Sequence, residues 1–350
     1  MSYILSYILF FNINIFYFIY TFNLFILYVK CAIIVLINNL NGTETVMIYV
    51  ISNCTNSKKL SPSNDLILEN YYFNNIDKSL TKWKKNINSS ISDLTPAKEL
   101  YKGHSWQETL KSIDILSKKF KTELLVSSAG YGLIDANKQI SSYQATFSRG
   151  NINSIHNFKS STLLTPTVEW WDKVNNFNTS ILNKSNYIFI TVSYEYLIAM
   201  QNTIKELIET FGDKIFIIVL SKEKLPKIYD NHILRFDTRF NSFEKGTINS
   251  IISRFTKWFF NEIVTYDLEL SNKILQNHID NFLLSFPVYT IPNRKQLSDT
   301  EILNIIKEQT KNKQITSKTK GLTNLRSQGY ACSQDRYGKL YTKIKGGKNG

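Results

Sequence analysis

Residues 47–54 read Met-Ile-Tyr-Val-Ile-Ser-Asn-Cys, a short apolar run that ends in small polar residues. Three more runs along the chain share this pattern, and together the four are Ile48–Ser52, Glu123–Val126, Tyr187–Val192 and Lys214–Leu220. They are rich in Ile and Val and lack regular polar alternation, which is typical of strands buried on both faces. The four runs therefore predict a buried sheet.

The segments between these runs show helical patterns, roughly over Asp65–Tyr72, Thr95–Phe120, Thr165–Leu182 and Tyr194–Phe211. Strands that alternate with helices predict an α/β fold, with a parallel sheet covered by helices on both faces. Ligands bind such sheets at the carboxyl ends of the strands. The small polar residues at those ends are expected to line one crevice, although each alone is equally explained as a turn former. They are Cys54, Thr55, Ser57, Ser127, Ser128, Ser193 and Ser221.

Composition narrows the class of protein. The 350 residues suffice for two domains of ordinary size. A content of 43% hydrophobic and 13% aromatic residues excludes a wholly disordered chain. The three cysteines, Cys31, Cys54 and Cys332, are widely spaced and form no CxxC pair. We therefore expect neither a disulfide framework nor a structural zinc site, and a reducing compartment is favoured.

Positive charge is concentrated near the C-terminus. The 42 Lys and Arg against 28 Asp and Glu leave a net charge of +14, and residues 292–350 carry +9 of it, with 13 basic and four acidic residues. This local excess of basic residues favours a polyanionic partner, DNA or RNA, over a membrane surface. A solvated basic surface on a small packing module is the alternative interpretation.

Three short helices are predicted in this basic tail, over Asp299–Thr310, Lys318–Gln328 and Gln334–Ile344. Ser298 and Glu301 have the spacing of a capping box before the first helix. Short helices joined by short turns predict a trihelical, helix-turn-helix-like module. The basic residues expected to contact nucleic acid are Lys318, Lys320, Arg326, Arg336, Lys339 and Lys343.

The first 46 residues form an apolar segment in which Lys30 is the first charged residue. This segment is interpreted as an over-long start of translation, with Met47 as the true first residue, or as a membrane anchor; a core helix is a third alternative. The two leading interpretations place the rest of the chain in the cytoplasm, and a membrane is a partner only if the anchor is real. The predicted parts are residues 1–46 as this apolar segment, 47–235 as the α/β domain, 236–291 as a helical cap or linker, and 292–350 as the basic module.

A glycine-rich turn is the most distinctive motif. Residues 127–132 read Ser-Ser-Ala-Gly-Tyr-Gly, where Gly130 and Gly132 permit a tight backbone path whose N–H groups could hold an anion or a base edge. Tyr131 and Tyr143 could stack on a planar ligand between them, and a glycine turn with two core tyrosines is the alternative. The predicted ligand-binding residues are Ser127, Ser128, Gly130, Tyr131, Gly132 and Tyr143.

The stretch SSAGYGLIDANKQISSYQATFSRG, residues 127–150, resembles the signature of the YaaA (peroxide-stress) family. The run Val192–Tyr196 resembles that family's Ala-Ser-x-Glu-Tyr motif, and Cys54 with its following lysines is similar to the core of archaeosine synthase. The resemblance covers about residues 47–221 and implies a uracil-DNA-glycosylase-like fold associated with nucleic acids and 7-deazaguanine bases. The family's Pro-Tyr-Arg element reads Ser-Tyr-Gln here, at residues 142–144, so that arginine is missing.

Four residues are candidates for catalysis: Cys54, Lys58, Ser193 and Glu195. Cys54 is a candidate nucleophile, because Lys58 is near enough in sequence to lower its pKa, and Lys58 could instead bind phosphate or form an amine adduct. Glu195, which follows Ser193, is a candidate general acid or base, or an exposed residue that favours the helix dipole. Walker, GxGxxG, GxSxG and HExxH motifs are absent from the sequence, so we expect no metal centre, no cofactor and no nucleotide hydrolysis.

Two functions follow from these features. The first is a YaaA-like protein that binds DNA or RNA through its basic tail and acts in a stress response. The alternative is an enzyme that processes a (deaza)purine base or nucleoside by glycosidic cleavage, base exchange or amine transfer. A membrane-anchored scaffold, the third hypothesis, depends wholly on residues 1–46.

Overall fold

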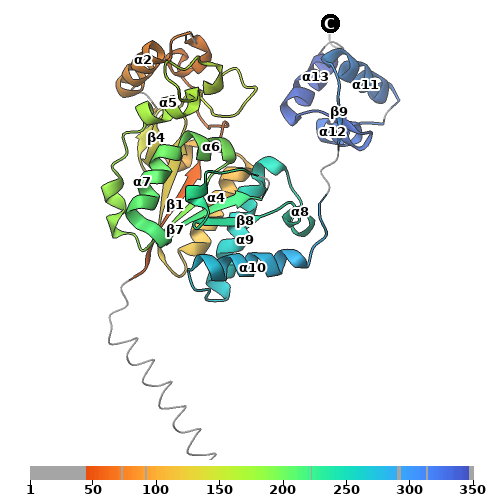
Figure 1. The fold of residues 1–350 in the computed structure, drawn as a ribbon. Helices are drawn as coiled ribbons and strands as arrows, with labels where there is room; N and C mark the ends of the chain where they lie inside the picture. Colours follow the sequence, from red (N-terminus) through yellow and green to blue (C-terminus); the bar gives the residue numbers. More distant parts are fainter. Residues whose placement is uncertain are drawn as a thin grey trace, which may run out of the picture. The chain divides into compact units, whose positions relative to one another are not determined.

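The computed structural model describes residues 45–71, 74–90, 93–221, 223–289, 293–312 and 314–346. The chain forms two compact units that divide between Pro287 and Val288, here named the α/β unit and the C-terminal unit (Figure 1). The predicted apolar segment lies outside the described residues except for residues 45 and 46. Among the described residues, no helix is long and apolar enough to cross a membrane.

The α/β unit is built on a six-stranded, mostly parallel sheet, as the apolar runs predicted. Its strand order is β4-β3-β1-β6-β7-β8, and only the β3–β4 pair is antiparallel. The four predicted strands correspond to β1, β3, β6 and β7, whereas the two edge strands have only four residues each and escaped the sequence pattern. The strands are β1 (Met47–Asn53), β3 (Lys121–Ser128), β4 (Gly132–Asp135), β6 (Tyr187–Thr191), β7 (Ile215–Leu220) and β8 (Ile233–Phe236).

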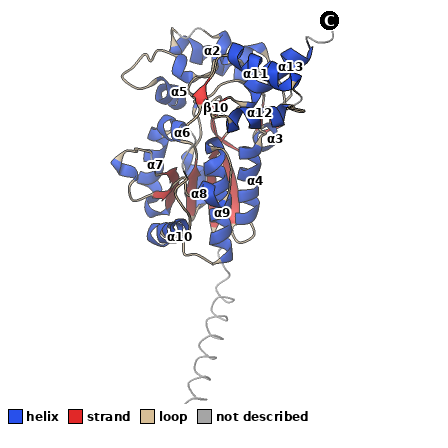
Figure 2. Cartoon of the chain, turned by 90° about the vertical axis from the view of Figure 1, so that its right-hand side faces the viewer, coloured by secondary structure: helices blue, strands red, loops and turns tan. Residues whose placement is uncertain are grey.

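Helices cover both faces of this sheet. Figure 2 shows α4 (His104–Leu116) and α9 (Ile251–Thr265) on one side of the strands and α7 (Gln201–Phe211) on the other. Aromatic packing explains the position of α9, because the ring of Phe260 lies edge-on to that of Phe189 in β6, with 5.1 Å between the ring centroids. The other helices of the unit are α2 (Ile76–Ser89), α3 (Ala97–Leu100), α5 (Pro166–Val174), α6 (Tyr194–Ala199), α8 (Phe240–Phe243) and α10 (Asn272–Leu284).

One predicted helix is replaced by other structure. The segment Asp65–Tyr72 was expected to be helical, but its described part contains two 3₁₀ turns, Asn64–Leu66 and Leu68–Asn70. The helix in this region is α2, which follows them. Its N-terminus is capped by Asn75, whose side chain accepts a hydrogen bond from the backbone N–H of Lys78 at 2.9 Å.

The C-terminal unit contains the three helices expected from the caps: α11 (Asp299–Lys311), α12 (Lys318–Ser327) and α13 (Gln334–Gly346). The capping box is confirmed, because the Ser298 hydroxyl accepts from the N–H of Glu301 and the Glu301 carboxylate accepts from the N–H of Ser298. A two-residue parallel pair, β9 (Lys295–Gln296) with β10 (Tyr330–Ala331), joins the segment before α11 to the segment between α12 and α13. The unit has its own hydrophobic core: Leu297, Ile302, Ile306, Ile315, Leu322, Leu325, Cys332, Tyr337, Leu340 and Tyr341.

Candidate functional site

The order in which the chain adds strands to the sheet reverses at β1, and a crevice is expected at such a point. From β1 the chain goes to β3 on one side and later to β6 on the other, which makes the carboxyl ends of β1 and β6 a topological switch point. The two ends are joined there, because the backbone N–H of Ser193 donates to the side-chain oxygen of Asn53 at 3.0 Å.

A cavity of about 650 Å³, here named the polar cavity, opens at this point. Its volume lies within the ordinary range of small-molecule sites. The wall is formed by the ends of β1 and β6 and by the first turns of α4, α6 and α9. Five hydroxyl side chains on the wall are almost fully buried: Ser52, Thr109, Thr146, Thr191 and Ser253. The cavity is therefore a built, polar site and matches the position predicted from the strand ends.

Cys54 lies on the wall of the polar cavity, and its sulfur is held by phenol groups. The hydroxyl of Tyr143 donates to Cys54 Sγ at 3.3 Å, and the hydroxyl of Tyr196 lies 3.1 Å from the same atom. Tyr143 is in turn 2.8 Å from the Ser128 hydroxyl and 3.1 Å from the Tyr101 hydroxyl. These five residues are named the Cys54 cluster.

Burial raises the pKa of Tyr101, Tyr143 and Tyr196 well above the usual value for tyrosine, and the neighbouring Cys54 raises it further. The three phenols therefore remain protonated at neutral pH and can act as hydrogen-bond donors. Two of them, Tyr143 and Tyr196, contact the sulfur of Cys54.

Lys58 lies behind the Cys54 cluster and is absent from the wall of the polar cavity. Its Nζ is 4.1 Å from the centroid of the Tyr143 ring, and it donates to the carbonyl of Thr55 at 3.4 Å. Burial lowers the pKa of Lys58 to about 8, because the charged amine is removed from water. The amine is thus closer to neutral than a surface lysine is at physiological pH.

Lys58 should therefore titrate near pH 8, at a lower pH than the surface lysines. Chemical-shift titration of lysine side chains labelled at Cε would show one resonance with this midpoint, and Lys58→Met would remove it. The midpoint is low because burial disfavours the charged form of the amine. The midpoint should therefore return towards the usual lysine value when the protein is unfolded in urea. A chain whose lysines all titrate above about pH 9.5 would contradict the burial of this amine.

The glycine-rich turn supports the Cys54 cluster from behind. Two buried tryptophans bond its carbonyls: Trp83 Nε1 donates to Gly130 at 2.9 Å and Trp170 Nε1 donates to Ala129 at 2.8 Å. A Cβ atom at Gly130 would lie 2.7 Å from the ring of Tyr143, so the glycine is needed for this close approach. The turn positions Tyr143 and does not line the polar cavity.

The expected sandwich of a planar ligand between Tyr131 and Tyr143 is absent. The two rings pack edge to face with centroids 5.4 Å apart, and Tyr143 is fully buried. The Tyr131 hydroxyl is also engaged, because it donates to the carbonyl and accepts from the N–H of Ser141. Core packing of the two rings has filled the space that the interpretation required.

The predicted residues thus fall into two groups. Cys54, Thr55, Ser57, Ser193 and Glu195 line the polar cavity. The others lie behind it or elsewhere, and Ser221 bonds the carbonyl of Phe236. The residues that do not line the polar cavity are Lys58, Ser127, Ser128, Gly130, Tyr131, Gly132, Tyr143 and Ser221.

Glu195 is held by two partners that sequence reasoning missed. One carboxylate oxygen accepts from Arg149 Nε at 3.1 Å, and the other lies 3.0 Å from His156 Nε2. Arg149 lies on the wall of the polar cavity and follows Tyr143 by six residues. The sequence signal for this arginine was the Ser-Arg-Gly end of the stretch quoted above, residues 148–150.

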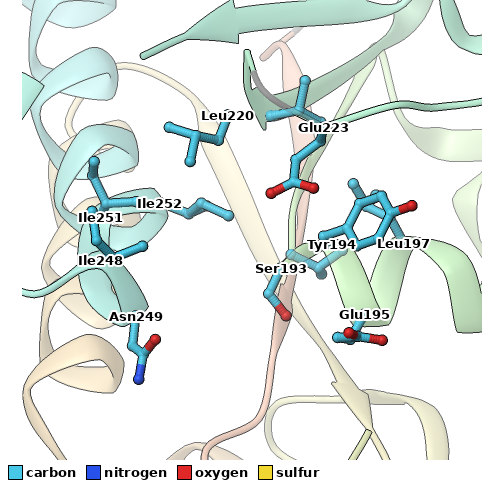
Figure 3. A pocket seen from close by; sticks show the side chains of 12 residues that line it. Ser193, Tyr194, Glu195, Leu197, Leu220, Glu223, Ile248, Asn249, Ile251 and Ile252 are labelled. Carbon is cyan, nitrogen blue, oxygen red and sulfur yellow. The ribbon is translucent and has the colours of Figure 1, made fainter. Parts of the chain in front are cut away.

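A second cavity of about 360 Å³, here named the apolar cavity, adjoins the first (Figure 3). It lies between the ends of β6 and β7 and the start of α9. Its wall shares Ser193, Glu195, Asn249 and Ile252 with the polar cavity. Within the described residues, no group of three His, Cys, Asp or Glu side chains could hold a metal ion.

The basic residues of the C-terminal unit also divide. Lys318, Lys320, Lys339 and Lys343 are exposed. Arg326 instead donates to the carbonyl of Cys332 at 2.9 Å, and Arg336 donates to the carbonyl of Leu297 at 2.8 Å and to the carboxylate of Asp299. The two arginines stabilise the unit, which leaves the four lysines as the candidate contact residues among the six predicted ones.

No protein-family model and no curated protein matches this chain.

Proposed function

We propose that the chain binds nucleic acid through α12 and α13 of its C-terminal unit, as a helix-turn-helix-like module. The observation that carries the proposal is the excess of positive charge on these two helices. The helices α12 and α13 carry four exposed lysines and one acidic residue, Asp335. By contrast, α11 carries three acidic residues, Asp299, Glu301 and Glu308, against two exposed lysines, Lys307 and Lys311. Two of these acids are already engaged, in the pair with Arg336 and in the capping box.

Salt dependence tests this proposal, because each lysine that neutralises a phosphate releases a counterion. Three to four such contacts predict a slope of about −3 to −4 for the logarithm of affinity against the logarithm of salt concentration, at about −0.9 per contact on duplex DNA. Fluorescence anisotropy of the full chain with a labelled duplex, at several salt concentrations, measures the slope. A slope near zero would mean that the lysines do not contact phosphate.

The sequence resemblance to YaaA proteins and uracil-DNA-glycosylase-like domains supports the same association and a stress-response role. In this proposal the α/β unit is a domain of that group, built around the switch-point crevice. The ligand of the crevice would then be a component of DNA or RNA, the class of molecule that the C-terminal unit binds in this proposal.

A second candidate function is an enzyme that processes a base or nucleoside in nucleic acid. It is favoured by the position of Cys54, which lies on the wall of a polar cavity with two phenol groups against its sulfur. This candidate requires release or exchange of a base, measured by chromatography of the nucleic acid after incubation. The activity should be lost in Cys54→Ser and kept in Cys332→Ser, which changes the buried cysteine of the other unit.

A further inference from the structure

The polar and apolar cavities, here named the polar and apolar chambers of the crevice, share part of one wall. Four residues, Ser193, Glu195, Asn249 and Ile252, belong to both walls. Ser193 and Glu195 stand at the end of β6 and the start of α6, and Asn249 and Ile252 stand at the start of α9. A ligand that extends past this shared wall would have its two ends in different surroundings.

The polar chamber suits an anionic group. Two cations, Lys102 and Arg149, belong to its wall together with one carboxylate, that of Glu195, which Arg149 bonds through its Nε. Lys102 is held there by its backbone, because its N–H donates to the carbonyl of Ser57 at 3.0 Å and its carbonyl accepts from the Thr55 hydroxyl at 2.9 Å. The first turn of α4 also belongs to this wall, and its N-cap Gly103 has no side chain to bond the first N–H groups of the helix.

Buried hydroxyl groups add to the hydrogen-bonding capacity of this chamber. The hydroxyl oxygens of Ser52 and Thr109 lie 3.4 Å apart, near the upper limit of a hydrogen bond, and both side chains are more than nine-tenths buried. A hydroxyl group can donate one hydrogen bond and accept two, so each has capacity for a further partner. Phosphate oxygens are acceptors that lysine, arginine, hydroxyl and backbone N–H groups can all bind.

The apolar chamber suits a flat ring with hydrogen-bond donors on its edge. Figure 3 shows Ile248, Ile251 and Ile252 on one side of it, with Tyr194 opposite, and the carboxylate of Glu223 directed towards the space between them. Aliphatic side chains and a tyrosine ring provide the apolar faces that a base requires. A carboxylate on the wall accepts hydrogen bonds, and an amino group offers it two N–H donors, so it favours a base that carries an amino group over one that has a ring N–H alone.

We propose that the crevice binds a nucleoside 5′-phosphate, with its phosphate in the polar chamber at Lys102 and Arg149 and its base in the apolar chamber beside Glu223. This proposal rests on the second candidate function and names the ligand class of that site. Adenine, guanine and cytosine carry amino groups, whereas uracil offers only its ring N3–H, so the crevice should bind uridine 5′-phosphate more weakly.

Calorimetric titration of the full chain with AMP, UMP, adenosine and inorganic phosphate tests the proposal. AMP should bind about tenfold or more tightly than adenosine or phosphate, because linking the two parts makes the second contact intramolecular. AMP should also bind more tightly than UMP. An AMP affinity no greater than that of either part would overturn the single-ligand crevice.

Two variants separate the chambers. Lys102→Gln should weaken AMP and phosphate by about tenfold and leave adenosine unchanged, because it removes one charged hydrogen bond. Glu223→Gln should weaken AMP and adenosine and leave phosphate unchanged. The matched controls are Lys118→Gln, at the far end of the segment that carries α4, and Glu209→Gln on α7, both exposed. AMP binding that either chamber variant leaves intact would place the ligand elsewhere.

A further variant distinguishes this site from the C-terminal unit. Replacement of Lys318, Lys320, Lys339 and Lys343 by Gln should leave AMP binding unchanged, whatever it does to duplex binding. Loss of AMP binding in that variant would place the nucleotide on the C-terminal helices and overturn the proposal. Base release, the test of the second candidate function, is measured separately from AMP binding, because Cys54→Ser can lose base release while it still binds AMP.

Discussion

Replacing Lys318, Lys320, Lys339 and Lys343 together by Gln should weaken the binding of duplex DNA by about a thousandfold or more at about 0.1 M salt. Each phosphate contact contributes about −0.9 to the salt slope, which corresponds to about eightfold in affinity at this salt concentration. Fluorescence anisotropy with the full chain measures the loss, and the salt slope should fall towards zero in the same experiment. Arg326 and Arg336 stay in place, so the internal hydrogen bonds of the unit are preserved.

The matched control changes net charge by the same amount in the other unit. Lys85, Lys118, Lys214 and Lys273 are exposed residues of the α/β unit, and their replacement by Gln should cost little affinity. Equal losses in the two variants would show that only the net charge of the chain matters. Unchanged binding in the first variant would assign the four C-terminal lysines to a solvated surface.

Trp170→Ala should lower the free energy of unfolding of the α/β unit by about 3–5 kcal/mol, the usual range for deletion of a buried tryptophan side chain. Trp170 is fully buried, packs edge-on to Trp83 with centroids 5.8 Å apart, and donates to the carbonyl of Ala129. Its removal leaves a cavity and also leaves that carbonyl without its indole partner. Urea unfolding followed by tryptophan fluorescence measures the loss, since all five tryptophans lie in the α/β unit.

Two further variants test the physical reason for this effect. Trp170→Phe keeps much of the apolar packing and loses the hydrogen bond, so its loss should be smaller. Tyr266→Ala removes an aromatic ring that is 62% exposed and should change the free energy of unfolding by no more than about 0.5 kcal/mol. A loss below about 1 kcal/mol in Trp170→Ala would mean that the glycine-rich turn does not depend on this indole.

Local features of the chain were readable before its fold was known. The central strands were predicted because a run such as Ile48–Ser52 is apolar on both faces, which is a property of consecutive residues. The helices α11, α12 and α13 were predicted within two residues at each end, because the serine before each one and the glycine after α12 are local stop and start signals. The strands β4 and β8 were missed because four residues are too few to show a period.

The Cys54 cluster shows where such reasoning ends. Cys54 was identified because it follows a strand directly, and strand ends meet at one edge of a parallel sheet. Tyr101 and Tyr196 contact it or its neighbours from 47 and 142 positions further along the chain. Tyr143 was selected as a stacking residue, but the requirement to fill the space next to Gly130 placed its ring in the core.

The sequence by itself determined the α/β class, the positions of the four main strands along the chain, the three C-terminal helices and the concentration of positive charge near the C-terminus. Each of these follows from neighbouring residues, through hydrophobic period, capping or composition. Only the tertiary structure decided that Arg149 and His156 hold Glu195, that Arg326 and Arg336 serve the C-terminal unit internally, and that two cavities share one wall. The physical reason is that a side chain's partner is set by packing between segments distant in sequence, and residue type alone carries no information about which segment that will be.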